Sequence, residues 1–377
     1  MQKKIISIMA LAGCAAGAMT SAQAQSSVTI YGDVDEYVGY IHSSSGTSVV
    51  GVNDGAILRS RLGFKGAEDL GGGYQTTFTL EQGFGANTGV AADSTRLFDR
   101  QAWVGLNTPS GEFRIGRQNT EIFNIGGAID YTARTTFGSL INTFGVPSRY
   151  DNDLSYKTAR VNGLQATVHY ALGEQAGGGL SQSAVYQLGL DYTSGPYRIG
   201  YAGLMANPAP TGTVSEKVQY HNVYADYDYG HGKIYTAIVR SNNITSSSSG
   251  LTAAQILSNV ASSGNVYAGT DINAQRYFDI YQLSADYQVN PQLRIGALYG
   301  AIKDTSGGSA GAQGGNVGAY YSLSVRTTLY GFVNYMKNDS AAGYRFSGSA
   351  SPTANLSGSD VNGRKLVGIQ MGILHTF

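Results

Sequence analysis

Apolar and polar residues alternate along most of this chain with a period of two. In residues 27–41, one set of alternate positions holds Val28, Ile30, Val34, Val38 and Tyr40. The other set holds Thr29, Asp33, Asp35 and Tyr37. Successive side chains of a strand point to opposite faces, so the pattern predicts strands with one apolar and one polar face. The alternation recurs in 58–66, 74–84 and 367–377.

Short and long connections alternate between the predicted strands. The short turns, rich in glycine, proline and asparagine, fall at 69–73, 107–112, 160–163, 193–196, 229–232, 289–291 and 324–328. The long polar loops fall at roughly 43–54, 85–95, 119–148, 173–183, 206–216, 241–273, 303–315 and 338–360. This regular alternation predicts about sixteen strands of roughly 9–15 residues, each of which returns across the same layer.

Two classes of β-protein fit an alternating pattern, a large soluble fold and a transmembrane barrel. Strands of soluble domains average only about 5–6 residues, and a sandwich needs a shared dry core. The longer strands predicted here suit an apolar belt of about 25 Å that is crossed at a tilt. A closed sheet also leaves no backbone group unpaired in lipid. We therefore expect a single all-β domain, a closed antiparallel transmembrane β-barrel of about 16 strands.

The N-terminal segment has the features of a secretory signal peptide. Lys3 and Lys4 precede an apolar run, and the small residues of the motif AQA end at Ala24. We expect cleavage there, which makes 1–24 the signal peptide and 25–377 the barrel domain.

A lipoprotein signal is the alternative interpretation of the same segment. The motif LAGC, at Leu11–Cys14, resembles a lipobox whose cysteine would be lipidated. Using it would leave an apolar core shorter than the roughly 7–15 residues that signal peptides usually have. Cleavage after Ala24 would also remove Cys14, the one cysteine of the chain.

Composition and charge narrow the class of partner. The chain has 52 glycines, 27 tyrosines and 7 prolines. Without Lys3 and Lys4, the 25 basic residues become 23 (25 less two), against 25 acidic residues. This near-neutral balance argues against a nucleic acid partner. Amphipathic tyrosine rings suit the two interfaces of a membrane, and tyrosines recur near predicted strand ends at Tyr31, Tyr192, Tyr197, Tyr201, Tyr229, Tyr287 and Tyr344.

The third long loop, at 119–148, is apolar for a segment in water. It contains Ile122, Phe123, Ile125, Ile129, Phe137, Leu140, Ile141 and Phe144. A barrel of about sixteen strands is too wide for its side chains to fill and leaves an aqueous channel. We expect the loop to fold into this channel and narrow it. The alternative is an Ω-like loop that packs on itself outside.

Several segments in the same order resemble one known family. They are SSVTIYGDVDEYVGY, SRLGFKGAEDLGGG, DRQAWVGL, FRIGRQ, RYDNDLSYKT, SLSVRTTLYGFVNYM and the final phenylalanine. Together they are similar to the general trimeric porins of Gram-negative outer membranes, especially those of betaproteobacteria. The resemblance implies a sixteen-stranded barrel whose third external loop lies inside as the constriction, where arginines on one wall face acidic residues of the loop.

Matching the family's motifs carries the arginine wall onto Arg61, Arg100 and Arg149, opposed by the loop carboxylates Glu121 and Asp130. Strand alternation adds Arg59 and Lys65 to the polar face that holds Arg61. Arg117 shares a face with Phe113 and Ile115, so either a bulge turns it inward or it points elsewhere. Arg134 lies within the loop and departs from a purely acidic constriction.

The expected function is passive diffusion of ions and small hydrophilic solutes, with a mild anion preference. Arginine stays protonated at physiological pH, and its field is focused in a narrow channel with low-dielectric walls. The resemblance further implies a homotrimer in outer-membrane lipid and a terminal Phe377 that the barrel-assembly machinery reads. Two other functions are possible for such a barrel. One is an adhesin or anchor with a blocked pore, and the other is an outer-membrane hydrolase.

Signals of catalysis or metal binding are weak. The histidines are scattered, and the chain lacks an HExxH or Walker motif. His221 and His231, with Asp226 and Asp228 between them, could be imagined as a metal site, but a solvated hairpin explains them better. We expect no enzyme, no cofactor and no metal. The capping-box spacing at 252–255 predicts a short helix in the loop at 241–273.

Overall fold

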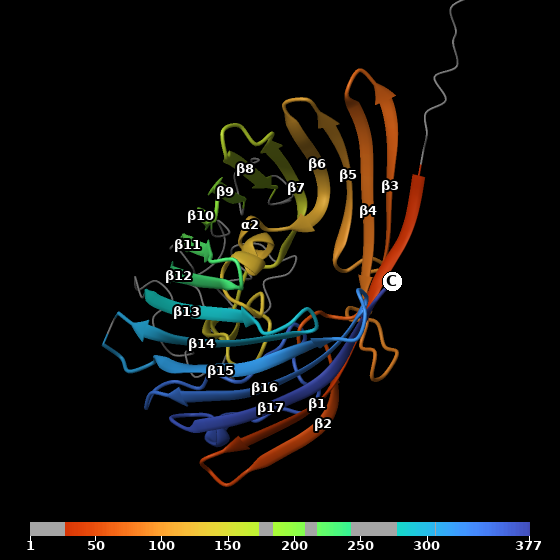
Figure 1. Cartoon of the computed structure of the whole chain (residues 1–377). Coiled ribbons are helices and arrows are strands. Elements are labelled where there is room, and N and C mark those ends of the chain that lie inside the picture. The colour runs from red at the N-terminus through yellow and green to blue at the C-terminus, as the bar shows by residue number, and fades with distance from the viewer. Residues whose placement is uncertain (1–26, 173–183, 208–216, 243–276, 306) are drawn as a thin grey trace, which may run out of the picture.

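The computed structural model describes residues 27–172, 184–207, 217–242, 277–305 and 307–377, which form one antiparallel sheet that closes on itself (Figure 1). The helix expected at 252–255 lies outside these residues. The first strands are β1 (Ser27–Ser43), β2 (Ser48–Asp54), β3 (Arg61–Gly71), β4 (Tyr74–Gly83), β5 (Gln101–Thr108), β6 (Gly111–Asn119), β7 (Arg149–Thr158), β8 (Leu164–Ala171) and β9 (Val185–Ser194). The others are β10 (Tyr197–Ala206), β11 (Val218–Asp228), β12 (Lys233–Ser241), β13 (Phe278–Gln288), β14 (Leu293–Asp304), β15 (Ala312–Ser322), β16 (Thr327–Asn338) and β17 (Lys365–Thr376).

The sheet contains 17 strand segments, but two of them share one position in the barrel. One half of β1 pairs with β3, where Asp33 faces Arg61, and the other half pairs with β2, where Glu36 faces Asp54. The second strand is therefore interrupted at 55–60, and the barrel has the sixteen positions that the sequence predicted. Its other edge is closed because β1 also pairs with β17.

A buried carboxylate satisfies the backbone at this interruption. The side chain of Asp35 accepts hydrogen bonds from the backbone N–H groups of Ile57, at 2.8 Å, and Leu58, at 2.7 Å. The backbone N–H of Asp35 donates in turn to Ser60 Oγ, at 2.9 Å. The strand can break here because the amides that leave the ladder have new acceptors.

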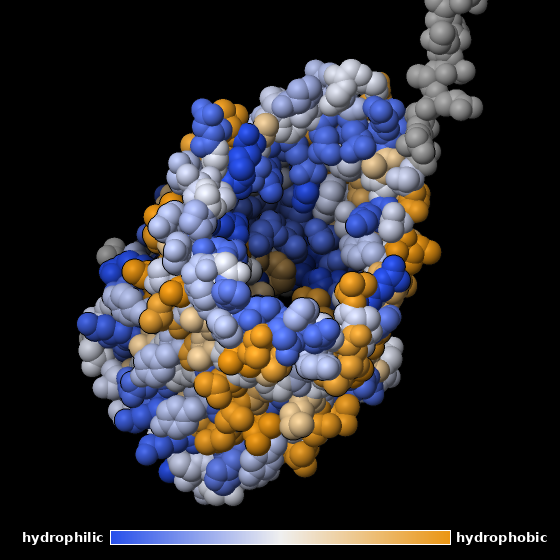
Figure 2. Space-filling model, in the orientation of Figure 1, coloured by the Kyte–Doolittle hydropathy of each residue, from blue (hydrophilic) through white to orange (hydrophobic). Residues whose placement is uncertain are grey.

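The two faces of the barrel differ as the alternation predicted. Outward-pointing residues are apolar and accessible, for example Val38 at 54%, Ile115 at 59% and Met371 at 64% exposed. The hollow seen at one end of the barrel is lined mostly by hydrophilic residues, whereas apolar residues gather on the outside (Figure 2). In water such a surface would be unfavourable, so the apolar face fits hydrocarbon or a neighbouring subunit.

Only some of the tyrosines predicted to lie at the membrane interfaces are exposed near strand ends. Tyr192, Tyr197 and Tyr287 are exposed, at 43%, 61% and 47%, on strand ends next to short turns. Tyr31 is different, because its hydroxyl donates to Glu81 within the wall. Tyr344 is also different, since it is 3% exposed and its backbone N–H donates to Asn338.

The helices are short and lie between strands. They are α2 (Glu121–Asn124), η1 (Ile125–Ala128), α3 (Leu140–Phe144) and η2 (Gly358–Asp360). Among the described residues, no helix is long and apolar enough to cross a membrane.

The connection between β6 and β7, residues 120–148, lies inside the barrel, as Figure 1 shows for α2. Its backbone N–H groups donate to side chains of the inner wall, from Leu140 to Gln282 at 3.0 Å and from Gly138 to Asn334 at 2.9 Å. Its ring of Phe137 stacks on Phe346 with the centroids 5.2 Å apart. The predicted inward fold is confirmed, and the Ω-like loop packed outside is excluded.

Candidate pore constriction

The structure brings two of the three predicted wall arginines into one ion-pair group. Arg61 Nε lies 2.8 Å from Asp33 Oδ2, and Arg100 Nε lies 2.7 Å from Glu81 Oε1. Glu81 also lies 3.9 Å from Arg61, so it links the two arginines. Arg149 is close enough to be repelled electrostatically by both.

Glu81 and Asp33 are the members of this group that sequence reasoning missed as site residues. Both fall on polar faces of their strands, so the alternation contains the signal needed to find them. Their pairing with Arg61 follows from the strand register. Arg61 lies opposite Asp33 on β1 and opposite Gly83 on β4, and Gly83 is two residues from Glu81. The acidic partners of the arginines therefore belong to the same wall.

Arg149 and Arg134 meet at one aromatic ring. The guanidinium carbons lie 4.7 Å and 4.5 Å from the ring centroid of Phe123 in the internal loop. Both arginines are buried, at 6% and 5% exposed. Among the described residues, Arg149 Nε and Nη2 and Arg134 Nε have no hydrogen-bond partner. Burial lowers the pKa of Arg134 to about 10, so it remains protonated at neutral pH.

Asp130 holds the internal loop in place. Its Oδ1 accepts from the N–H and hydroxyl of Thr132 and from the N–H of Arg134, at 2.7–2.9 Å. Its Oδ2 accepts from Ser139 Oγ, at 3.0 Å, and from Gln282 Nε2 on β13, at 2.6 Å. The carboxylate is 1% exposed and faces these donors, so its charge is used to anchor the loop to the wall.

Glu121 fixes the other end of the loop against β8 and β9. Its N–H donates to Gln187, at 3.0 Å, and its carboxylate lies 3.9 Å from His169 Nε2. His169 Nδ1 is 2.8 Å from Asp153. Burial by itself would raise the pKa of Glu121, but the combined effect of His169, Lys157 and Asn124 outweighs burial and lowers that pKa. A Cβ at Gly189 would lie 2.4 Å from Glu121 Cγ, so α2 packs this closely only because residue 189 is glycine.

Arg117 is engaged elsewhere. A register shift does lie between Gly116 and Gln118, as a bulge requires. In the ladder between β5 and β6, Arg117 pairs with Ala102. This pair lies two positions from Val104 and Ile115, whose side chains face outward. Arg117 Nη1 binds Asp151 at 2.6 Å, and Arg96 binds the same carboxylate with two hydrogen bonds at 3.0 and 2.8 Å. Asp151 therefore holds Arg117, which also lies close enough to Arg149 to repel it electrostatically.

Arg59 and Lys65 lie on either side of Arg61 along the chain. Arg59 is half-buried at the strand interruption, and its backbone carbonyl accepts from Arg61 Nε at 3.1 Å. Lys65 is exposed and pairs with Thr79 in the ladder between β3 and β4. Thr79 lies two residues from Glu81, on the side of the short turn. Lys65 therefore lies beside the ion-pair group but not in it.

A second set of charges lies on the inner wall near the short turns. Asp191 binds Arg160 and Arg198, Asp226 binds Lys233, and Asp286 binds Arg294. The carboxylate side chains are 3–11% exposed and the basic ones 34–40%. Cations therefore face the lumen in front of buried carboxylates. Sequence reasoning missed this arrangement because it depends on which strands are neighbours.

The imagined metal site does not assemble. Asp226 binds Lys233, whereas His221 hydrogen-bonds to Tyr201 at 2.7 Å. Among the described residues, no group of three or more histidine, cysteine or acidic side chains could hold a metal ion.

A closed barrel with an apolar exterior and a charged lumen narrowed by an internal loop defines a channel of an outer membrane. The chain belongs to the Gram-negative porin family, which matches residues 9–341. It is therefore a non-enzymatic channel of the Gram-negative outer membrane.

Individual relatives agree over almost the whole length. An outer membrane porin protein of Bordetella pertussis is 29% identical over 90% of this chain and 95% of its own. Outer membrane porin protein 32 of Delftia acidovorans is 27% identical over the whole of both chains. The solved anion-selective porin from Comamonas acidovorans has a TM-score of 0.75, with 24% identity, over 94% of this chain and all of that one. The last comparison supports the fold.

Proposed function

We propose that this porin is a passive diffusion channel for ions and small hydrophilic solutes with a mild preference for anions. The path runs between the internal loop and the wall that carries Arg61, Arg100 and Arg149. The observation that carries the proposal is the excess of buried positive charge at this point. The three wall arginines stand beside two wall carboxylates, Asp33 and Glu81.

Two physical effects translate this excess into selectivity. Charges in a narrow channel with low-dielectric walls are screened less than the Debye length of about 8 Å would give in bulk solution. The buried guanidinium groups of Arg149 and Arg134 keep a positive charge next to the lumen, which attracts anions electrostatically. The preference stays mild because Glu81 and Asp33 neutralise part of the wall.

The cations near the short turns support the same sign. Arg198, Lys233 and Arg294 expose 34–40% of their side chains to the lumen. Their carboxylate partners lie behind them in the wall, so an ion entering from this end meets the positive groups first. The short turns face the periplasm in barrels of this class.

A charge-removal experiment tests the proposal. The double variant Arg134→Gln, Arg149→Gln is inserted into planar bilayers under a tenfold salt gradient, and the zero-current potential is measured. We expect the wild-type potential to have the anion-selective sign and the variant to move toward zero. Arg240→Gln is the matched control, because Arg240 binds Asp279 and its side chain is 53% exposed on the outer face. An equal shift in both variants would contradict the proposal.

Assembly follows the same proposal. Family resemblance suggests a homotrimer, export by a signal peptide at 1–24, and recognition of Phe377 by the barrel-assembly machinery. The barrel acting as an adhesin with a blocked pore is the alternative. Reconstituted protein that binds a surface but conducts no ions would favour that alternative.

A further inference from the structure

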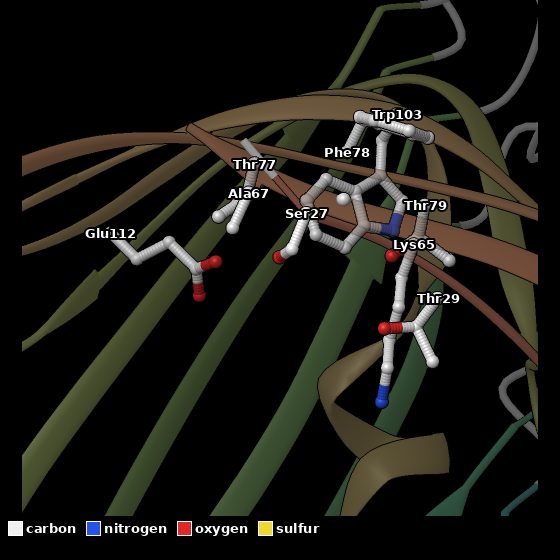
Figure 3. A pocket seen from close by; sticks show the side chains of 10 residues that line it. Ser27, Thr29, Lys65, Ala67, Thr77, Phe78, Thr79, Trp103 and Glu112 are labelled. Carbon is white, nitrogen blue, oxygen red and sulfur yellow. The ribbon is translucent and has the colours of Figure 1, made fainter. Parts of the chain in front are cut away.

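A cavity of about 260 Å³ opens on the inner wall beside the ion-pair group, toward the short turns. Its volume is near the lower end of the roughly 300–1,000 Å³ of small-molecule pockets. Its lining includes Lys65, Ala67, Thr77, Thr79, Trp103 and Glu112 (Figure 3).

The register of β1, β3, β4 and β5 builds this cavity from two rows of inward-facing side chains. One row runs from Thr29 through Lys65 and Thr79 to Trp103. The adjacent row runs from Ser27 through Ala67 and Thr77 to Gly105. The second row contains two of the smallest residues next to the bulky first row. This difference in size leaves the hollow.

The charge of the cavity is positive. Among the described residues, no carboxylate lies within ion-pair distance of Lys65, whose ammonium group lies 5.2 Å from the ring centroid of Tyr31. The other charged lining residue, Glu112, is neutralised by Arg114 at 2.8 Å. An anionic solute would therefore find one free cation here.

The rest of the lining fits a solute with hydroxyl groups and a C–H face. Thr77 Oγ1 is buried and has no hydrogen-bond partner among the described residues. The guanidinium of Arg114 lies 4.1 Å from the Trp103 ring centroid, and the indole also borders the cavity. In Figure 3 the indole lies between Glu112 on one side and Lys65 on the other. Aromatic faces contact C–H surfaces, and serine and threonine hydroxyls can both donate and accept.

We propose that this cavity is a docking site for a small hydroxylated organic anion, such as a sugar acid. Lys65 binds the carboxylate, the threonine hydroxyls bind the hydroxyl groups, and Trp103 contacts the carbon chain. The site lies in the lumen and would hold a solute during its passage, so it rests on the proposed channel function. Lys65 thereby selects among solutes, apart from the constriction that selects among ions.

Trp103 is the one tryptophan of the chain, so intrinsic fluorescence reports directly on this site. The purified full-length protein in detergent is titrated at constant ionic strength with gluconate, glucose or acetate. We expect a saturable fluorescence change with gluconate. Glucose lacks the charge and should bind at least about tenfold more weakly, as the loss of one charge-assisted contact implies. Acetate keeps the charge but lacks the hydroxyl groups, and the loss of two or more neutral hydrogen bonds of about 1 kcal/mol each should weaken its binding about tenfold or more.

Variants separate docking from general electrostatics. Lys65→Gln should weaken gluconate binding at least about tenfold, whereas Lys65→Arg should retain most of it. Ala67→Leu should block the site by filling the hollow. Lys233→Gln is the matched control, because it removes one lumen cation at a different site, where Lys233 pairs with Asp226. Heat-modifiable migration on gels confirms that each variant folds.

The outcomes distinguish this site from the channel itself. A linear, unsaturated change that is the same for all three solutes would overturn the docking site. Equal affinity in the wild type and Lys65→Gln would also overturn it. If these results occur while anion-selective conductance persists, the inference fails and the proposed function stands.

Discussion

The anchoring of the internal loop by Asp130 can be tested with Asp130→Ala. The substitution removes the acceptor of five hydrogen bonds, from the Thr132 N–H and hydroxyl, the Arg134 N–H, Ser139 and Gln282. Such bonds contribute about 1 kcal/mol each, and donors left buried without partners add to the cost, so we estimate ~3–5 kcal/mol. Since about 1.4 kcal/mol is a factor of ten, the undocked loop should become about 10²–10⁴-fold more populated.

Single-channel recording detects this change. We expect Asp130→Ala to show frequent conductance fluctuations that the wild type lacks, while the sign of ion selectivity is unchanged. Asp130→Asn keeps one carbonyl acceptor and should be intermediate. Asp93→Ala, which alters an aspartate in the connection between β4 and β5, is the control. Recordings of Asp130→Ala with wild-type noise and conductance would refute the anchoring role. A large shift in selectivity instead would indicate that this carboxylate faces the ion path.

Three further predictions concern the wall and the barrel seam. Glu81→Gln frees Arg100 from its ion pair and should raise the anion-to-cation permeability ratio by about twofold, measured as a zero-current potential; a lower ratio would contradict the role of the wall. Gly189→Val brings a side chain against Glu121 and displaces α2, so it should change the single-channel conductance. An unchanged conductance would show that the loop accommodates the larger side chain without moving into the pore. Deleting Phe377 removes two backbone hydrogen bonds with Gly32, at 3.1 and 3.0 Å, and should reduce the yield of heat-modifiable barrel; normal insertion would count against an assembly role.

Much of the fold could be predicted from local pattern because a membrane barrel repeats one simple rule. Alternate residues meet lipid or water, and this rule applies to Val38 in the first strand and Met371 in the last. The interruption of the second strand could not be predicted in the same way. It depends on the hydrogen bonds that the side chain of Asp35 accepts from the backbone amides of residues 57 and 58. The sequence around Asp35 does not indicate these contacts, because the amides lie far along the chain.

For the candidate site, the sequence predicted only which face of its strand each charged residue occupies. Strand alternation placed Arg61 on the polar side, but the partner that matters, Glu81, comes from another strand and is defined by register. For Asp130, a charge in an internal loop suggested a pore-facing role, whereas tertiary donors such as Gln282 surround it. Arg149 meets Phe123 because the loop folds back, which a motif alone does not specify.

We propose that water and ions pass through a lumen whose narrow part is positively charged. The most direct test is the zero-current potential of the wild-type protein in a planar bilayer under a potassium chloride gradient. We expect stepwise conductance on insertion and a potential of anion-selective sign. A barrel that inserts without conducting, or a potential of cation-selective sign, would contradict it.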